Sequence, residues 1–388
     1  MSFVVCPFEA LVDYARKGIF MPKNYLRVSE SVCAGHPDKL ADQISDSVLD
    51  SALSQDENSR VALETLVAEN LVVMAGEITT KAKLNYQQIA KKVIANNGYT
   101  NDMWGFSESA EIKLAIHHQS PEIAVGVGDD TGAGDQGMCF GYATNETSSY
   151  MPLPIVVAHD LTKKIEKKKK NKQLAFLRPD GKAQVVVRYE NDQPVGIEHL
   201  TIPVPHNEDV SIREGRQELT KAIIKPVLKS HGLIIPKEII INGTGVWHNP
   251  GPASDVGLTG RKIIVDTYGG AAKAGGGAFS GKDPSKVDRS GAYAARFIAK
   301  NIVASGLADR AEVCLAFYIG APRAIIKQID TFGTAKKSDE TIVGFADRLI
   351  DCSVKNIIGQ LDLKKVQYVD TATYGHFGKP HYPWEKIA

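Results

Sequence analysis

Hydrophobic and polar residues alternate in two neighbouring stretches near the start of the chain, residues 60–67 and 70–78. A polar break separates them, so we predict a hairpin of two strands. The next stretch, residues 86–95, carries apolar residues at helical spacing. This part of the chain therefore predicts a strand–strand–helix unit.

The same order of elements recurs in the middle of the chain. Residues 184–189 and 196–204 predict a second pair of strands. Residues 211–228 then predict an amphipathic helix that Pro226 interrupts, because proline lacks the N–H that a helix interior needs.

A third unit begins with strands predicted at residues 312–319 and 324–329 and continues with helical spacing over residues 339–361. Three sheets, each backed by helices, would account for this order and for the length of the chain. We therefore predict an α+β fold of three similar domains, with approximate internal threefold symmetry.

The composition is typical of a folded globular protein. The chain has 388 residues, of which 43% are hydrophobic and 23% charged, so it is neither a disordered chain nor a fibre. The formal net charge is only +1, and nothing global indicates a nucleic acid or an anionic membrane as partner. Every apolar run ends before the roughly 18 residues that a membrane helix needs. Any polyanion site must therefore be built locally.

The cysteines and the N-terminus indicate a cytoplasmic protein. Five scattered cysteines without a Cys-x-x-Cys pair are typical of reduced thiols and do not indicate zinc. The first twenty residues lack the cationic start and long apolar stretch of a signal peptide, and they contain Glu9 and Asp13, unlike a transit peptide. We interpret them as a dispensable extension.

Seven lysines occur within residues 163–172. Such a run is compatible with nucleic-acid binding. It continues an apolar-spaced segment, however, and no aromatic residue is interleaved for base stacking. The solvated end of a helix is therefore the favoured interpretation.

The segment Gly35-His36-Pro37-Asp38-Lys39 is the first candidate for chemistry. Pro37 suits the first turn of a helix, which the apolar spacing after it also predicts. His36, Asp38 and Lys39 would then surround a helix N-terminus, where free N–H groups favour phosphate and an aspartate can hold magnesium. A helix cap without further function is the alternative.

The glycine-rich segment 275–289 is the second candidate and also precedes a predicted helix. It contains Gly-x4-Gly-Lys, but Asp283 stands where a Walker loop needs a Ser or Thr hydroxyl. The glycines still allow backbone N–H groups to approach an anion, while Lys282 and Lys286 supply charge. Asp288 would supply the missing oxygen for a metal. A structural glycine loop is the alternative.

Two shorter glycine-rich segments carry further charged residues. One places Arg261 and Lys262 directly before a predicted strand at residues 263–265. Successive strand positions would point these side chains to opposite sides, one toward a pocket and the other toward a partner subunit. The other segment surrounds Asp135 with three glycines. Surface cations and a tight turn are the respective alternatives.

The coincidence of these segments indicates more than any one of them. Two glycine-rich loops with lysines and an Arg-Lys pair, each beside an aspartate, are typical of a magnesium–polyphosphate site. ATP is therefore a supported ligand. Composition and spacing do not identify the atom of the nucleotide that reacts.

Together these motifs closely resemble those of the S-adenosylmethionine synthetase (methionine adenosyltransferase) family. The resemblance runs from about Asn24 to Lys386 and also includes residues 29–31, 143–147 and 374–378. It implies three α+β domains with strands partly exchanged between them, after an N-terminal extension. The corresponding boundaries are 1–23, 24–125, 132–249 and 251–388.

The resemblance also implies the reaction and the assembly. Family members join methionine to ATP: the thioether sulfur attacks ribose C5′ and expels triphosphate, which is hydrolysed to diphosphate and phosphate. A thioether needs no general base, so catalysis should depend on in-line alignment and on cations that neutralise the triphosphate. The implied assembly is a homodimer with active sites at the subunit interface, paired into a homotetramer, without nucleic acid or membrane.

Roles follow from the resemblance by position in the motifs. The implied catalytic residues are His36, Lys182, Arg261 and Lys282. The implied ATP contacts are these four together with Asp180, Trp247, Asp255, Lys262 and Ala278. The implied methionine contacts are Glu77, Gln119, Asp135, Asp255 and Lys286. The implied metal ligands are Asp38 and Asp288 for a pair of Mg²⁺ ions and Glu64 for K⁺.

Two segments depart from the family pattern. In residues 242–250, Trp247 replaces the phenylalanine expected near adenine, which it can still contact by stacking, and Val246 replaces an arginine. Residues 126–131 form a shorter segment than usual in a region that acts as a mobile lid in relatives.

Two other functions stay open at this point. The first is an ATP-dependent kinase or phosphohydrolase that uses the same polyphosphate loops, for which Glu77 and Gln119 would have no methionine to hold. The second is a non-catalytic nucleotide-binding regulatory subunit, which would not need His36, Lys182 and Lys282 together.

Overall fold

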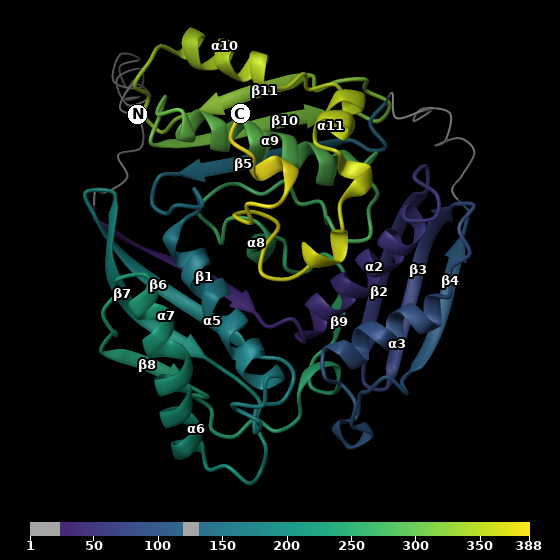
Figure 1. The fold of residues 1–388 in the computed structure, drawn as a ribbon, viewed down its shortest axis with the longest axis vertical. Helices are drawn as coiled ribbons and strands as arrows, with labels where there is room; N and C mark the ends of the chain where they lie inside the picture. The colour runs from purple at the N-terminus through teal and green to yellow at the C-terminus, as the bar shows by residue number, and fades with distance from the viewer. Residues whose placement is uncertain (1–23, 119–131) are drawn as a thin grey trace, which may run out of the picture.

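A computed structural model of the protein describes residues 24–118 and 132–388. It consists of three β-sheets, each covered by helices (Figure 1). The α+β class predicted from the hydrophobic pattern is confirmed. The N-terminal extension, Gln119 and the segment 126–131 lie outside the described residues.

Two of the sheets have four strands and one has three. The first, in the order β1-β6-β7-β8, consists of Tyr25–Val32, Lys182–Glu190, Gln193–Ile202 and Glu238–Ile241. The second, in the order β4-β3-β2-β9, consists of Glu111–His117, Leu71–Thr79, Arg60–Ala68 and Gly257–Leu258. The third, in the order β11-β10-β5, consists of Ile326–Asp330, Arg310–Phe317 and Gly137–Thr144. The pairs β3–β4 and β7–β8 are parallel, and the others are antiparallel.

The helices pack on these sheets to bury their apolar sides. In the second sheet the odd-numbered residues of β2 are buried against α2 and the even-numbered ones are more exposed. In the first sheet α5 packs on β1 and β6, and in the third α9 packs on β5 and β10. The helices are α2 (Pro37–Leu53), α3 (Tyr86–Asn96), α5 (Leu153–Lys170), α6 (Ile212–Leu219), α7 (Lys225–Ser230), α8 (Ile263–Asp266), α9 (Val287–Ala304), α10 (Asp339–Leu349) and α11 (Val354–Gln360).

Most elements predicted from periodicity are confirmed, with differences that have local causes. The predicted helix at 211–228 is α6 and α7 joined by a π-helical turn, Thr220–Ile224, and Pro226 is the second residue of α7. The helical stretch 339–361 is two helices, α10 and α11. The lysine-rich run is the end of α5, which confirms the interpretation as a helix end.

The chain passes from one sheet to another at the glycine-rich motifs. β1 comes first in the chain but pairs with β6, so the Gly35–Lys39 segment follows directly where the chain leaves one sheet for α2. β5, which follows Asp135, pairs with β10, and β9 pairs with β2. The motifs therefore lie where the three sheets meet, and segments far apart in the sequence become neighbours there.

One predicted strand is wrong. Residues 263–265 are aliphatic and suit a strand, but they form the short helix α8. Its end is held by Asp266, whose buried carboxylate accepts a hydrogen bond from Lys39 Nζ at 2.5 Å. The strand in this segment is β9 instead, so tertiary contacts override the local preference.

Candidate functional site

His36 directly precedes helix α2 and is its N-cap. His36 Nδ1 accepts a hydrogen bond from the Asp38 N–H at 3.2 Å. The ring is buried, and burial together with the charges of Lys182 and Lys262 lowers the pKa of His36 to about 3. The imidazole is therefore neutral at physiological pH. Since Nδ1 is the acceptor, the proton is on Nε2, which makes that nitrogen a hydrogen-bond donor.

Asp38 contacts the two adjacent cations of the shorter glycine-rich segment, Arg261 and Lys262. Its carboxylate lies 2.5 Å from Lys262 Nζ and 3.7 Å from Arg261 Nε, and it accepts the Leu258 N–H at 3.0 Å. Burial raises the pKa of this carboxyl, but the hydrogen bonds from Lys262 and Leu258 outweigh it and the net pKa is lowered. The prediction that Arg261 and Lys262 point to opposite sides is wrong, because no strand follows them.

The next two aspartates of α2 hold the two glycine-rich loops. Asp42 accepts the Gly260 N–H at 2.9 Å, and Asp46 accepts the Gly281 N–H at 2.9 Å. Residues four apart on a helix lie one turn, about 6 Å, from each other on the same face. The loops that carry Lys262 and Lys282 are therefore held one helical turn apart.

These side chains belong to a row along one face of α2, which we call the aspartate row: Asp38, Asp42, Asp46 and Asp50. Asp46 also accepts two hydrogen bonds of 2.8 Å from the buried guanidinium of Arg289. Asp38 is the one member of the aspartate row that the sequence motifs predicted as a site residue. The spacing i, i+4, i+8 of identical acids on one helix is the signal that would have revealed it.

Asp180, in the central part of the chain, lies close to the loop before α2 that carries His36. Its Oδ1 accepts the Gly181 N–H at 2.6 Å and its Oδ2 the Gly251 N–H at 3.2 Å. Burial raises the pKa of Asp180 to about 6. A Cβ added at Gly35 would lie 3.0 Å from the Asp180 backbone nitrogen, so a larger residue there would require the Asp180 backbone to shift by a few tenths of an ångström. Lys182 begins β6 opposite the last residue of β1, next to the start of α2.

The second glycine-rich segment places its charges in pairs. Lys282 Nζ lies 2.5 Å from Asp288 Oδ2, and Lys286 forms an ion pair with the buried Asp283. A Cβ added at Gly277 would lie 2.1 Å from the Asp288 carboxyl carbon, so the loop folds closely around this acid. Ala278 packs against the loop that carries Arg261 and Lys262, since a Cβ on Gly260 would lie 2.5 Å from the Ala278 Cβ.

Lys282 shares a sheet face with two further predicted residues. It bridges Ala62 of β2, which in turn faces Glu77 of β3. Directly opposite residues point to the same face and strands are about 4.8 Å apart, so Lys282 and Glu77 lie on one face about 10 Å apart. Glu64, two residues from Ala62 on β2, lies on the same face. Glu77 itself lies 3.8 Å from His117 Nε2.

The remaining predicted residues are less enclosed. Asp135, Asp255 and Glu64 are exposed, and Trp247 is half-buried with its indole N–H donating to the Asn249 carbonyl at 2.7 Å. The described chain therefore brings together His36, Asp38, Asp180, Lys182, Arg261 and Lys262, with Ala278, Lys282, Lys286 and Asp288 one turn away. It leaves the four less enclosed residues at the edges of this group.

The carboxylates of the site could hold a divalent cation only together with ligands from the substrate or from water. Within residues 24–118 and 132–388, no three His, Cys, Asp or Glu side chains cluster as a metal site. Mg²⁺ commonly binds through one or two carboxylates together with phosphate oxygens and water. Asp38 and Asp288, each now paired with a lysine, fit that kind of site.

The fold is of the α+β class, and the lysines, arginine and aspartates that meet between its sheets are of the kind that polyphosphate sites use. Family models match nearly the whole described chain: the S-adenosylmethionine synthetase N-terminal domain at residues 24–121, the central domain at 130–247 and the C-terminal domain at 250–386. The protein belongs to the S-adenosylmethionine synthetase family and is a transferase, a methionine adenosyltransferase. The family implies ATP and methionine as substrates and uses metal ions. No helix within the described residues has the length and hydrophobicity of a membrane span.

Proposed function

We propose that this chain forms S-adenosylmethionine by in-line attack of the methionine sulfur on ribose C5′ of ATP. In this proposal triphosphate leaves intact and is then hydrolysed to diphosphate and phosphate. The observation that carries the proposal is the convergence of His36, Lys182 and Lys262 on the start of α2. A neutral donor and several cations suit a leaving polyphosphate.

His36 has the protonation state that this step needs. Because the ring is neutral and Nδ1 is occupied by the Asp38 N–H, Nε2–H is the group that donates to the oxygen between C5′ and the phosphate chain. A donor held in advance stabilises the charge that develops there as the C–O bond breaks. Removing it should lower kcat more than it raises KM, since its benefit grows in the transition state.

The cations would neutralise the rest of the chain. Lys262 and Arg261 are positioned by Asp38, and Lys282 by Asp288. Lys182 and Asp180 would contact phosphate and ribose. Trp247, Asp255 and Ala278 complete the proposed nucleotide contacts. Arg261, Lys262 and Lys282 would also assist the hydrolysis of triphosphate.

Asp38 and Asp288 would hold Mg²⁺, because each offers a carboxylate beside the proposed path of the phosphates. Mg²⁺ bound there would neutralise phosphate charge and orient the chain. Lys262 and Lys282 would then exchange their carboxylate contacts for phosphate contacts. Glu64 would bind K⁺ at the exposed sheet face.

The residues proposed to bind methionine are less buried than those proposed to bind ATP. Glu77, Asp135, Asp255, Lys286 and Gln119 would hold the amino acid. Since Glu77 and Asp135 lie toward open surfaces, a homodimer with the site at the interface would enclose them, and two dimers would form a homotetramer. The proposed domains are 24–125, 132–249 and 251–388.

One experiment tests the reaction. The purified protein is incubated with ATP, methionine, Mg²⁺ and K⁺, and the sulfonium product is measured by mass together with phosphate and diphosphate. Formation of the sulfonium in equal amount to diphosphate is the expected result. Phosphate release without a sulfonium would support a kinase or phosphohydrolase, and ATP binding without any product would support a regulatory subunit.

A further inference from the structure

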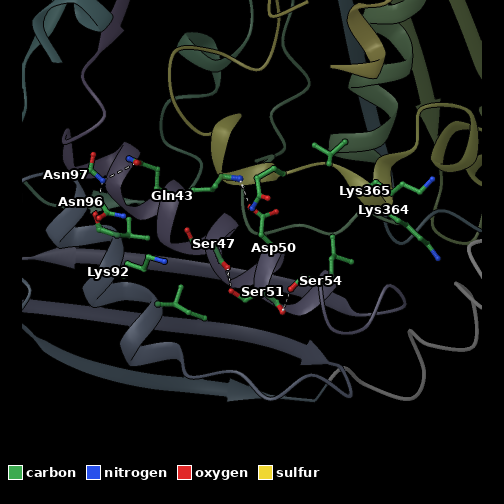
Figure 2. Close-up of a pocket in the computed structure, with 16 residues that line it drawn as sticks. Gln43, Ser47, Asp50, Ser51, Ser54, Lys92, Asn96, Asn97, Lys364 and Lys365 are labelled. Atoms are coloured by element: carbon green, nitrogen blue, oxygen red, sulfur yellow. Dashed lines mark hydrogen bonds between the residues drawn. The ribbon is translucent and has the colours of Figure 1, made fainter. Parts of the chain in front are cut away.

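A cavity of about 580 Å³ lies between α2, α3 and residues 364–369, and none of the proposed nucleotide contacts lines it (Figure 2). The Asn97 amide on its wall already donates to Gln43 Oε1 at 3.1 Å. No aromatic side chain is among the lining residues, all of which the structure describes. A nucleotide base therefore has no stacking surface in this cavity, whereas the half-buried indole of Trp247 offers one at the proposed site.

The indole of Trp247 is tied to its own loop, residues 242–250. Its N–H donates to the Asn249 carbonyl at 2.7 Å, and Ser254 Oγ donates to the same carbonyl at 2.6 Å. The orientation of the ring therefore follows that of the loop. The contacts that join this loop to the rest of the protein decide where a base can stack.

His248, the next residue, makes one of these contacts with its side chain. The His206 N–H donates to the Trp247 carbonyl at 2.9 Å, and His248 Nδ1 lies 2.8 Å from the His206 carbonyl oxygen. A carbonyl only accepts, so Nδ1 of His248 carries the proton and is the donor. The two imidazole rings also pack edge to face, with their centroids 5.1 Å apart. Both backbone groups of His206 are thus bonded to the Trp247–His248 pair.

The same unit reaches the residue proposed to contact ribose. The Arg178 N–H donates to the Pro205 carbonyl at 3.0 Å, next to His206, and Arg178 Nη1 donates to the His248 carbonyl at 2.7 Å. Arg178 lies two residues before Asp180. The proposed base contact and the proposed ribose contact are therefore joined by a short set of hydrogen bonds, in which His248 takes part with its ring and with its carbonyl.

We propose that His248 is a positioning residue for the nucleotide: its ring holds the indole of Trp247 where the adenine of ATP stacks on it. The inference rests on the contact between Trp247 and adenine that is part of the proposed function. Without the hydrogen bond from the ring, the loop must be ordered when the base binds, and that ordering lowers affinity.

The effect of His248 should be confined to the adenosine part of the substrate. The cations proposed to bind the phosphates are held elsewhere, Lys262 by Asp38 and Lys282 by Asp288. A residue that merely stabilised the fold would weaken the binding of both parts. The two roles are therefore separable by ligands that differ in adenosine alone.

Calorimetric titration of the full-length protein with Mg²⁺ and without methionine makes this comparison. The probes are adenosine 5′-(β,γ-imido)triphosphate and imidotriphosphate, of which only the first carries adenosine. His248→Ala should raise the Kd of the nucleotide probe about tenfold and that of imidotriphosphate less than about twofold. His248→Asn should restore the nucleotide Kd to within about threefold of the parent, because the asparagine amide can donate from the position of Nδ1.

Two further variants serve as references. Trp247→Ala removes the stacking surface itself and should weaken the nucleotide probe at least as much as His248→Ala. His199→Ala is the matched control, since the His199 ring also makes hydrogen bonds, to Glu238 at 3.1 Å and to Thr201 at 2.9 Å, but none of these partners belongs to the Trp247 loop. It should leave both Kd values unchanged.

The outcomes separate this inference from the function on which it rests. Equal weakening of both probes by His248→Ala, an unchanged nucleotide Kd in His248→Ala when Trp247→Ala weakens it, or no rescue by His248→Asn would overturn the role of His248. No effect of either Trp247→Ala or His248→Ala would overturn the adenine contact together with the inference. Sulfonium formation by the parent is measured separately, so the proposed reaction stands or fails in its own assay.

Discussion

The acidic side chains of the aspartate row of α2 differ in burial and in hydrogen bonding from those on the outer face of strands β2 and β3. Asp38, Asp42 and Asp46 are buried and engaged by lysine, arginine or backbone N–H groups. Glu64 is exposed on β2, and the ion-pair partner of Glu77 on β3 among the described residues is His117, at 3.8 Å. Asp42 and Asp46 therefore find their partners within one chain, while Asp38 is the member of the row that is also proposed to bind Mg²⁺. The acids of the sheet face have no lysine or arginine partner within residues 24–118 and 132–388.

This difference separates two kinds of function. The buried row costs desolvation that only fixed partners offset, so it suits the precise placement of loops. The exposed acids keep their hydration and can exchange it for an incoming ion, substrate or second subunit. Substitutions should therefore damage stability in the first region and ligand response in the second.

The largest effect is expected for Arg289→Met. The substitution leaves Asp46 buried without the guanidinium that bonds both of its oxygens. Breaking such a pair should lower the free energy of unfolding by about 3–5 kcal/mol. Unfolding by guanidinium chloride at constant protein concentration measures this free energy. Arg323→Met, which breaks the exposed pair with Asp351, serves as the control and should cost below about 1 kcal/mol. Equal losses would contradict the role of the row.

Lys282→Met should be the next most damaging change, and its effect should appear in activity. The variant keeps the alkyl stem but removes the ammonium proposed to neutralise triphosphate. Loss of one such donor should lower kcat for S-adenosylmethionine formation by about 10²–10³-fold. Lys327→Met is the control, because Lys327 also pairs with a carboxylate, Asp347, far from the proposed site. A kcat within a few-fold of this control would count against the proposed role.

The pH dependence of stability isolates His36. Its folded pKa is about 3 and its ordinary value 6.5, so below pH 6.5 the unfolded chain takes up a proton that the folded chain refuses. The contribution of His36 to the free energy of unfolding should therefore fall by about 1.4 kcal/mol per pH unit as pH decreases from 6.5 toward 3. The buried His159 and His376, whose pKa values are also lowered, add contributions of the same sign. Between pH 7 and pH 5 the contribution of His36 amounts to about 2 kcal/mol.

His36→Asn should remove that part of the pH dependence, since asparagine caps a helix but does not titrate. Unfolding curves at pH 7 and pH 5 are compared for the parent, His36→Asn and His117→Asn. His117 is largely exposed, so its variant should lose as much stability on acidification as the parent. If His36→Asn and His117→Asn respond alike, His36 is not neutral in the folded state.

The comparison also shows what the sequence could predict. The start of α2 was predictable because Pro37 and the following apolar spacing are local signals, and the hairpin of β2 and β3 was predictable from alternation. Both signals act within about ten residues of chain. The family motifs extend this to the loops that are proposed to bind phosphate.

The partners of those loops were not predictable in the same way. Asp42 and Asp46 resemble the solvated face of an amphipathic helix, yet they are buried because loops more than 200 residues later cover them. The helix α8 was missed for the same reason, since the buried contact between Lys39 and Asp266 is a long-range one. Long-range polar partners leave no local periodicity, so the supporting shell of the site emerges only from the fold.

The smallest effect on stability is expected for Glu64→Gln, and it gives the sharpest test of the exposed region. Glu64 is exposed and has no ion-pair partner among the described residues, so the free energy of unfolding should change by less than about 0.5 kcal/mol. If Glu64 binds K⁺, the KCl concentration for half-maximal activation should rise several-fold at constant ionic strength. Glu69→Gln, at another exposed glutamate just beyond β2, should leave that concentration unchanged. Identical KCl curves for both variants would exclude Glu64 as the potassium ligand, and a large loss of stability would place it with the buried row instead.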